Sequence, residues 1–164
     1  MIILVKNKHT LKVDEFQFKC CVGKNGTALV KKEGDQKTPK GLFSIGNLFY
    51  RKDRIPKPQT KLKSVIINKE DGWCNDILNP KKYNKLVKVN KKIRHEKLYR
   101  RDNKYNLLIP IKYNYTNPKI PRGSCIFLHL TNTYKPTAGC IALKEKDFLI
   151  LLKLINHKSK IMIY

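Results

Sequence analysis

Apolar and polar residues alternate over short stretches of this chain, a pattern typical of half-buried β-strands. Residues 16–22 begin with such alternation, and the glycines at 23 and 26 then predict a turn. Residues 106–112 and 124–130 are apolar runs bounded by turn residues. The predicted strands cover residues 2–5, 11–13, 16–22, 41–45, 64–67, 106–112, 124–130 and 161–164.

One helix is predicted over residues 144–156, because apolar side chains recur there at helical spacing. The apolar residues of this helix are Phe148, Leu149, Leu151, Leu152 and Ile155. Residues 79–101 follow neither period, so we expect mainly loop there. With no repeat, low-complexity tract or break in composition, the sequence favours one domain over residues 1–164, mainly β with few helices.

The formal net charge of +24 favours attraction to polyanions, nucleic acid included. Only six of the 36 basic residues are Arg, the residue type that grips phosphate and guanine with two parallel bonds. The chain is also rich in Asn and Ile, so the Lys excess is typical of an AT-rich genome. Lysine is spread along the chain, and no nucleic-acid motif is present. Nucleic acid is therefore not a favoured partner. A basic polyanion-binding module with a purely structural Cys140 stays as an alternative.

Five cysteines form no CxxC pair, which argues against a zinc ribbon or a redox dithiol. Their odd number leaves at least one thiol free in a monomer, the state that we expect. No stretch is long and apolar enough to span a bilayer. The first four apolar residues after Met1 are too short for a secretory signal, so the compartment stays open between cytoplasm and cell envelope.

A candidate nucleophile and base lie close together in the sequence. His129 ends an apolar run, and the pair Gly139-Cys140 follows after a polar loop. An imidazole near a thiol, which alone has a pKa of about 8.5, can lower that pKa and accept the proton. Gly139 permits close approach of a substrate carbonyl, and the N–H groups around Gly139 and Cys140 are candidate oxyanion donors. Each residue alone also has an ordinary structural explanation.

The sequence resembles the L,D-transpeptidase (YkuD-type) catalytic domain family along residues 1–164. Residues 126–129 (Ile-Phe-Leu-His) and 137–143 (Thr-Ala-Gly-Cys-Ile-Ala-Leu) are similar to its signature, in which a His precedes a [Ser/Thr]-His-Gly-Cys box. Residues 34–43 resemble its Asp-x-x-Thr-Pro-x-Gly-x-Phe segment. Residues 71–76, 83–84, 95–99 and 122–124 resemble blocks of a compact bacterial subgroup. Two positions depart from the signature: Ala138 replaces its second His, and Ala142 replaces a polar Arg or Asn.

The resemblance implies a β-sandwich or barrel whose longest helix follows the catalytic Cys, and a peptidoglycan stem peptide as substrate. Cys140 would attack the carbonyl of the third residue, His129 would act as base, and the Leu130 carbonyl would orient the imidazole. The thioester would pass to an acceptor amine, as in a transpeptidase, or to water, as in an L,D-carboxypeptidase. No metal or cofactor is implied, and anionic cell-wall polymers are further candidate partners.

Several other residues are candidates for substrate binding, and each also has a structural explanation. Trp73 would form a wall of the substrate groove or pack in the core. Thr38 lies in a turn that would border the cleft, and His95 stands beside Glu96. The complete set of predicted substrate contacts is Trp73, Arg122, His95, Thr38 and Thr137.

Overall fold

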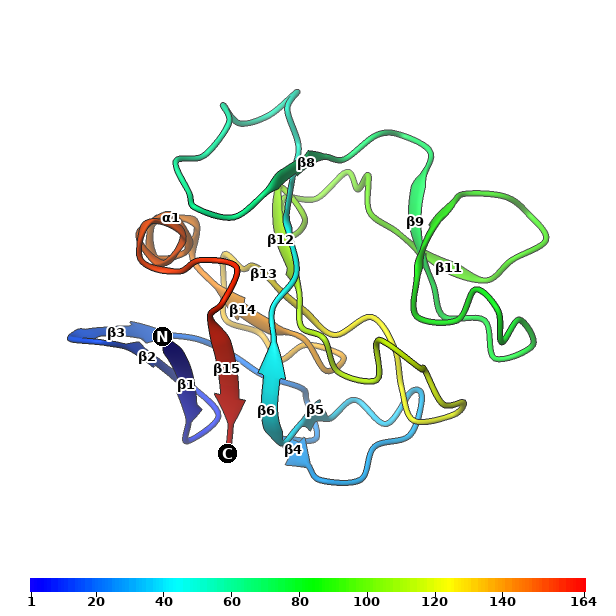
Figure 1. Cartoon of the computed structure of the whole chain (residues 1–164), viewed down its shortest axis with the longest axis horizontal. Helices are drawn as coiled ribbons and strands as arrows, with labels where there is room; N and C mark the ends of the chain where they lie inside the picture. The colour runs from blue at the N-terminus through cyan, green and yellow to red at the C-terminus, as the bar shows by residue number, and fades with distance from the viewer.

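Short strands make up most of the fold in the computed structural model, which describes residues 1–164 (Figure 1). Fifteen strands form two five-stranded sheets, one three-stranded sheet and one two-stranded pair, and there is one helix. The mainly β class with few helices is therefore confirmed. No helix of the structure has the length and apolar character needed to cross a membrane.

The first five-stranded sheet joins the two ends of the chain. Its strand order is β3-β2-β1-β15-β6, and the first and last strands, β1 and β15, pair in parallel, so the chain begins at one end of this pair and finishes at the other (Figure 1). Alternate side chains such as Ile3, Val5 and Ile161 are buried, as the alternating pattern predicts. The strands are β1 (Ile2–Lys6), β2 (Thr10–Val13), β3 (Phe16–Lys19), β6 (Gly41–Ser44) and β15 (Lys160–Ile163).

The second five-stranded sheet separates two apolar clusters and has the order β14-β13-β12-β7-β8. Leu128, Leu130 and Ile141 on one face belong to the main core, together with side chains of the first sheet and the helix. Phe127 and Cys140 belong to a smaller cluster. The strands are β7 (Leu48–Tyr50), β8 (Ser64–Ile66), β12 (Leu107–Pro110), β13 (Phe127–Leu130) and β14 (Ile141–Leu143).

The predicted helix is present as α1 (Glu145–Leu154). Phe148, Leu151 and Leu152 are buried against the main core, whereas Leu149, predicted to be on the buried face, is 37% exposed. Ile155 is buried but lies at the C-cap, just beyond the helix.

The prediction of a loop over residues 79–101 is wrong in part. Two short strands there, β10 (Leu86–Lys88) and β11 (His95–Lys97), pair with opposite edges of β9 (Asp71–Cys74). Both strands have only three residues, and their side chains are exposed or half-buried. They are strands because their backbones pair with β9, and their sequences show no alternation of apolar and polar residues. β4 (Thr27–Ala28) and β5 (Thr38–Pro39) form the small parallel pair.

Candidate active site

Two adjacent parallel strands bring His129 and Cys140 to the same face of the second sheet. β13 pairs with β14 in a register that sets Leu128 opposite Ile141 and His129 opposite Ala142. Cys140, one residue before β14, therefore lies next to Phe127, whose N–H donates to its Sγ at 3.4 Å. Because side chains alternate along a strand, Phe127, His129 and Cys140 share the face opposite the main core.

The imidazole of His129 is held by the backbone of the next residue. Its Nδ1 lies 2.8 Å from the carbonyl oxygen of Leu130. A carbonyl oxygen only accepts hydrogen bonds, so Nδ1 carries the proton and Nε2 is left as the acceptor. Burial lowers the pKa of His129 to about 4, so the ring is neutral at pH 7. A neutral imidazole with a free Nε2 is the form that a general base requires.

The Cys140 thiol is buried, with 8% of the residue exposed, and donates to the carbonyl oxygen of Cys125 at 3.2 Å. Burial, and to a smaller extent the carboxylate of Glu96, raises the pKa of Cys140 above its usual range. The expected lowering of the thiol pKa by His129 is therefore wrong for this structure. Both side chains are therefore neutral at pH 7 in this structure.

The backbone around Cys140 is arranged by Thr137 and Gly139. The Thr137 hydroxyl accepts from the Gly139 N–H at 3.1 Å and donates to the Cys140 carbonyl at 2.6 Å. The Cys140 N–H makes no hydrogen bond. Of the two N–H groups predicted as oxyanion donors, the one of Gly139 is thus engaged, and the one of Cys140 is available.

Thr38 supports this segment from a distant part of the chain. Its buried hydroxyl accepts from the Gly23 N–H and donates to the Gly139 carbonyl, both at 2.8 Å. The Lys37 carbonyl packs so closely on Gly139 that a Cβ there would lie 2.8 Å from its oxygen. Gly139 also has a φ of +139°, which only glycine adopts readily. The Thr-Pro segment therefore fixes the backbone next to the thiol.

His129 and Cys140 both line a cavity of about 530 Å³. The loop of residues 131–138 borders it, together with charged side chains from several segments: Lys31, Glu33, Glu96, Arg100, Asp102, Lys104 and Lys135. Lys31 is buried and binds Asp35 at 2.5 Å and the Lys37 carbonyl at 2.7 Å. Burial alone would raise the pKa of Asp35, but hydrogen bonds from Lys31 and two backbone N–H groups lower it below its usual range. The ion pair and the bond to Lys37 hold the Lys31 side chain in place at the cavity wall.

The model of the YkuD L,D-transpeptidase catalytic domain family matches residues 1–163. The chain belongs to this family. The family model is that of a catalytic domain, and it covers nearly the whole chain.

Two solved structures are similar to this L,D-transpeptidase family member. The helical cell shape determining protein Pgp2 from Campylobacter jejuni is 18% identical with a TM-score of 0.49, over 99% of this chain and 46% of that one. Bd1075 from Bdellovibrio bacteriovorus is 16% identical with a TM-score of 0.47, over 99% of this chain and 47% of that one. The chain thus spans less than half the length of these structures. No curated protein matches it.

The predicted substrate contacts of this L,D-transpeptidase domain are not all found at the cavity. Thr137 lines it, while Thr38 lies behind Gly139. Trp73 is buried and donates from its indole nitrogen to Asn84 at 2.9 Å. The Nδ1 atom of His95 lies 2.6 Å from the carbonyl oxygen of Ile93. Neither Trp73 nor His95 lines the cavity. The exposed Arg122 does not line it either.

The two departures from the family signature both lie at the cavity that contains His129 and Cys140. Ala138 and Ala142 both line the cavity, so the side chains that the family carries there are missing from its wall. The structure describes no group of three or more His, Cys, Asp or Glu side chains able to hold a metal ion.

Tyr105 lies beside His129 and is not predicted from the sequence. Its ring is buried, lies edge-on to His129 with 5.3 Å between ring centroids, and its hydroxyl donates to Glu96. Glu96 is the sequence neighbour of His95, which does not predict its contact with Tyr105. Tyr105 precedes β12 in a turn, where a single aromatic residue gives no periodic signal.

Proposed function

We propose that this domain is a peptidoglycan L,D-transpeptidase that acylates Cys140 with a stem peptide. The proposal depends above all on one observation, that His129 and Cys140 line the same cavity from adjacent strands. The His129 Nδ1 contact with Leu130 supports it, because this contact leaves Nε2 as the acceptor.

In the first half of the reaction, the Cys140 sulfur attacks the carbonyl carbon of the third stem-peptide residue. His129 Nε2 takes the thiol proton as the C–S bond forms, so the thiol turns from Cys125 toward the imidazole. The free Cys140 N–H stabilises the oxyanion. The amide bond to the terminal D-alanine then breaks, and His129 returns the proton to the leaving amine.

In the second half, an acceptor amine attacks the thioester carbonyl and His129 takes one of its protons. The C–S bond breaks, and the proton passes to the sulfur, which restores the Cys140 thiol. With water as acceptor the same steps give L,D-carboxypeptidase activity. The two activities differ only in the acceptor.

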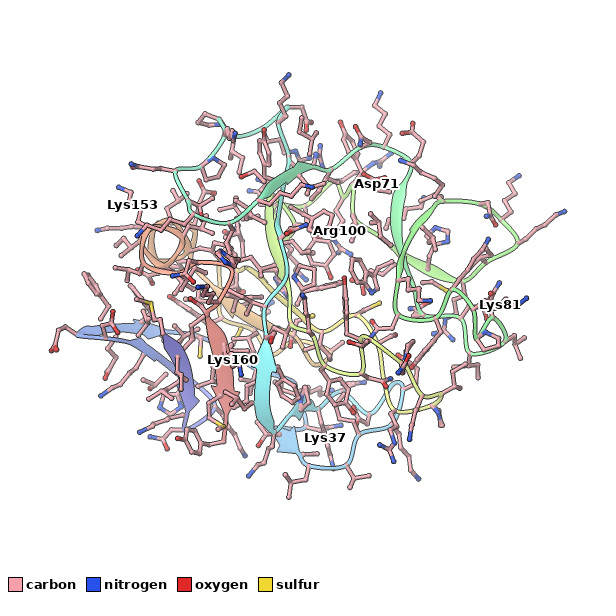
Figure 2. All side chains as sticks on the ribbon, in the orientation of Figure 1. Lys37, Asp71, Lys81, Arg100, Lys153 and Lys160 are labelled. Atoms are coloured by element: carbon pink, nitrogen blue, oxygen red, sulfur yellow. The ribbon has the colours of Figure 1, made fainter.

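The alternative of a basic polyanion-binding module requires cationic side chains gathered on one face. Lys81 and Lys153 instead lie on opposite sides of the molecule, and Lys160 lies apart from both (Figure 2). This distribution favours the enzyme over the polyanion-binding module. Salt-dependent DNA binding that Cys140→Ala leaves intact would favour the alternative.

The proposal is tested with a purified tetrapeptide stem ending in D-alanine, with and without an acceptor peptide that carries a free amine. Liquid chromatography and mass spectrometry follow free D-alanine and cross-linked product. We expect wild type to release D-alanine, and Cys140→Ser and His129→Asn to lose at least about a hundredfold in rate. Release of D-alanine at the wild-type rate by Cys140→Ser would overturn the proposal.

A further inference from the structure

Glu96 is a carboxylate in the same cavity as the nucleophile, in a chain with a net charge of +24. It lies on β11, and its side chain is 28% exposed, so a ligand in the cavity can reach it. One carboxylate oxygen, Oε1, accepts from the Tyr105 hydroxyl, and the Tyr105 ring packs against His129. Glu96 is therefore fixed in position one side chain away from the base.

The Glu96 carboxylate makes no hydrogen bond to the neighbouring cation, Arg100. Arg100 Nη1 is 3.9 Å from Oε1, because its guanidinium is held by Asp102 through bonds of 2.9 and 2.6 Å. Arg100 lies between β12 and β9 in the view of Figure 2. The second oxygen of Glu96, Oε2, accepts no hydrogen bond from the protein.

A second acceptor in the same cavity comes from Asn75. Glu96 pairs with Trp73 across β11 and β9, and Asn75 comes directly after β9, which ends at Cys74. Asn75 lines the cavity, and its Oδ1 is buried without a donor. A buried unpaired acceptor is costly, so both residues present acceptors to a ligand with N–H donors.

A carboxylate near the thiol hinders the first half of the reaction, because negative charge opposes loss of the thiol proton. In the thioester the sulfur has no proton to lose, so this penalty disappears. The chemistry of the second half instead needs a group that attracts an amine and takes a proton from it. Glu96 has the charge and the location for that step.

We propose that Glu96, with Asn75 beside it, binds the ammonium group of the acyl acceptor and takes its first proton, so that an amine is preferred over water. This inference rests on the proposed function. The acceptor R–NH₃⁺ gives one proton to the Glu96 carboxylate, and its nitrogen attacks the thioester carbonyl. The second proton passes through His129 to the Cys140 sulfur as the C–S bond breaks. The products are the new amide, the free thiol and one proton that Glu96 releases to solvent.

The test compares wild type with Glu96→Gln, which keeps the shape of the side chain and removes its charge. Glu15→Gln, at an exposed carboxylate outside the cavity, is the matched control. With one donor peptide and increasing acceptor amine, the ratio of cross-linked to hydrolysed product is measured. We expect Glu96→Gln to need about ten times more acceptor for the same ratio, while Glu15→Gln behaves as wild type.

Two further measurements distinguish weaker binding of the acceptor from a general loss of catalytic activity. The rate of the initial D-alanine burst should not fall in Glu96→Gln, because acylation does not use the acceptor and the charge that opposes loss of the thiol proton is gone. Methoxyamine, which is uncharged at neutral pH, should accept the acyl group equally well from wild type and variant. Glu96→Asp keeps the charge on a shorter side chain, and an intermediate ratio is expected even if Glu96→Gln does not fold.

An unchanged product ratio in Glu96→Gln would overturn the inference. A burst that falls as much as cross-linking would also overturn it, because Glu96 would then act on the thiol. If wild type is acylated but yields only hydrolysed product at every acceptor concentration, the inference fails and the thioester chemistry stands. If wild type forms no thioester, the proposed function itself fails.

Discussion

The hydroxyl of Thr38 donates a 2.8 Å hydrogen bond to the carbonyl oxygen of Gly139, 101 residues later in the chain and next to the nucleophile. The same hydroxyl accepts from the Gly23 N–H, so one buried side chain ties together three segments. Thr38 is thus a positioning residue for Cys140 and not a wall of the cavity.

Thr38→Val is expected to remove both hydrogen bonds while keeping the volume of the side chain. It leaves a buried N–H and a carbonyl without partners, which should lower the free energy of unfolding by about 1–3 kcal/mol. Acylation of Cys140 should slow as well, because Gly139 is no longer held. Urea unfolding and the D-alanine burst measure the two effects, with Thr10→Val, a half-buried threonine of β2, as control. Equal behaviour of the two variants would contradict this role.

Gly139→Ala should destabilise the protein more than Gly34→Ala. Both glycines have positive φ, +139° and +79°, but only at Gly139 would a Cβ meet backbone, 2.8 Å from the Lys37 oxygen. We expect a loss of about 1 kcal/mol at Gly34, from backbone conformation alone, and about 3 kcal/mol or more at Gly139. Thermal or urea unfolding checks this difference. Equal losses would show that the backbone beside Cys140 can relax.

The pH dependence of acylation follows from the neutral state of His129. Only the neutral ring accepts the thiol proton, and burial lowers the pKa of His129 to about 4. The rate constant should therefore stay level from about pH 8 down to about pH 5 and fall as the ring is protonated near pH 4. Stopped-flow measurement of the burst gives this profile. A fall already centred near pH 6.5, the ordinary histidine value, would mean that the imidazole is solvated and not buried.

Trp73→Phe should affect stability and leave substrate binding unchanged. The indole is buried, and its N–H donates to Asn84, a bond that phenylalanine cannot make. We expect a loss of about 1–3 kcal/mol in the free energy of unfolding and the same KM for the donor peptide. A higher KM with normal stability would restore Trp73 as part of the substrate groove.

The alternating strands and the helix after Cys140 could be predicted because their side chains follow the periods of buried β and α structure. His129 and Cys140 could be predicted from their chemistry and from resemblance to a known signature. β10 and β11 could not, since backbone pairing to β9 and not side-chain pattern defines them. The raised pKa of Cys140 could not either, because burial depends on segments far apart in the sequence, such as Cys125 and Tyr105.

Cys140, with His129 as its general base, should be open to acylation. Intact-mass measurement after exposure to a carbapenem, whose strained carbonyl acylates a nucleophilic thiol, tests it most directly. We predict a wild-type mass increased by one carbapenem, with peptide mapping to Cys140, and no adduct on Cys140→Ser. An unmodified wild type, or an adduct that persists in Cys140→Ser on another of the four remaining thiols, would contradict it.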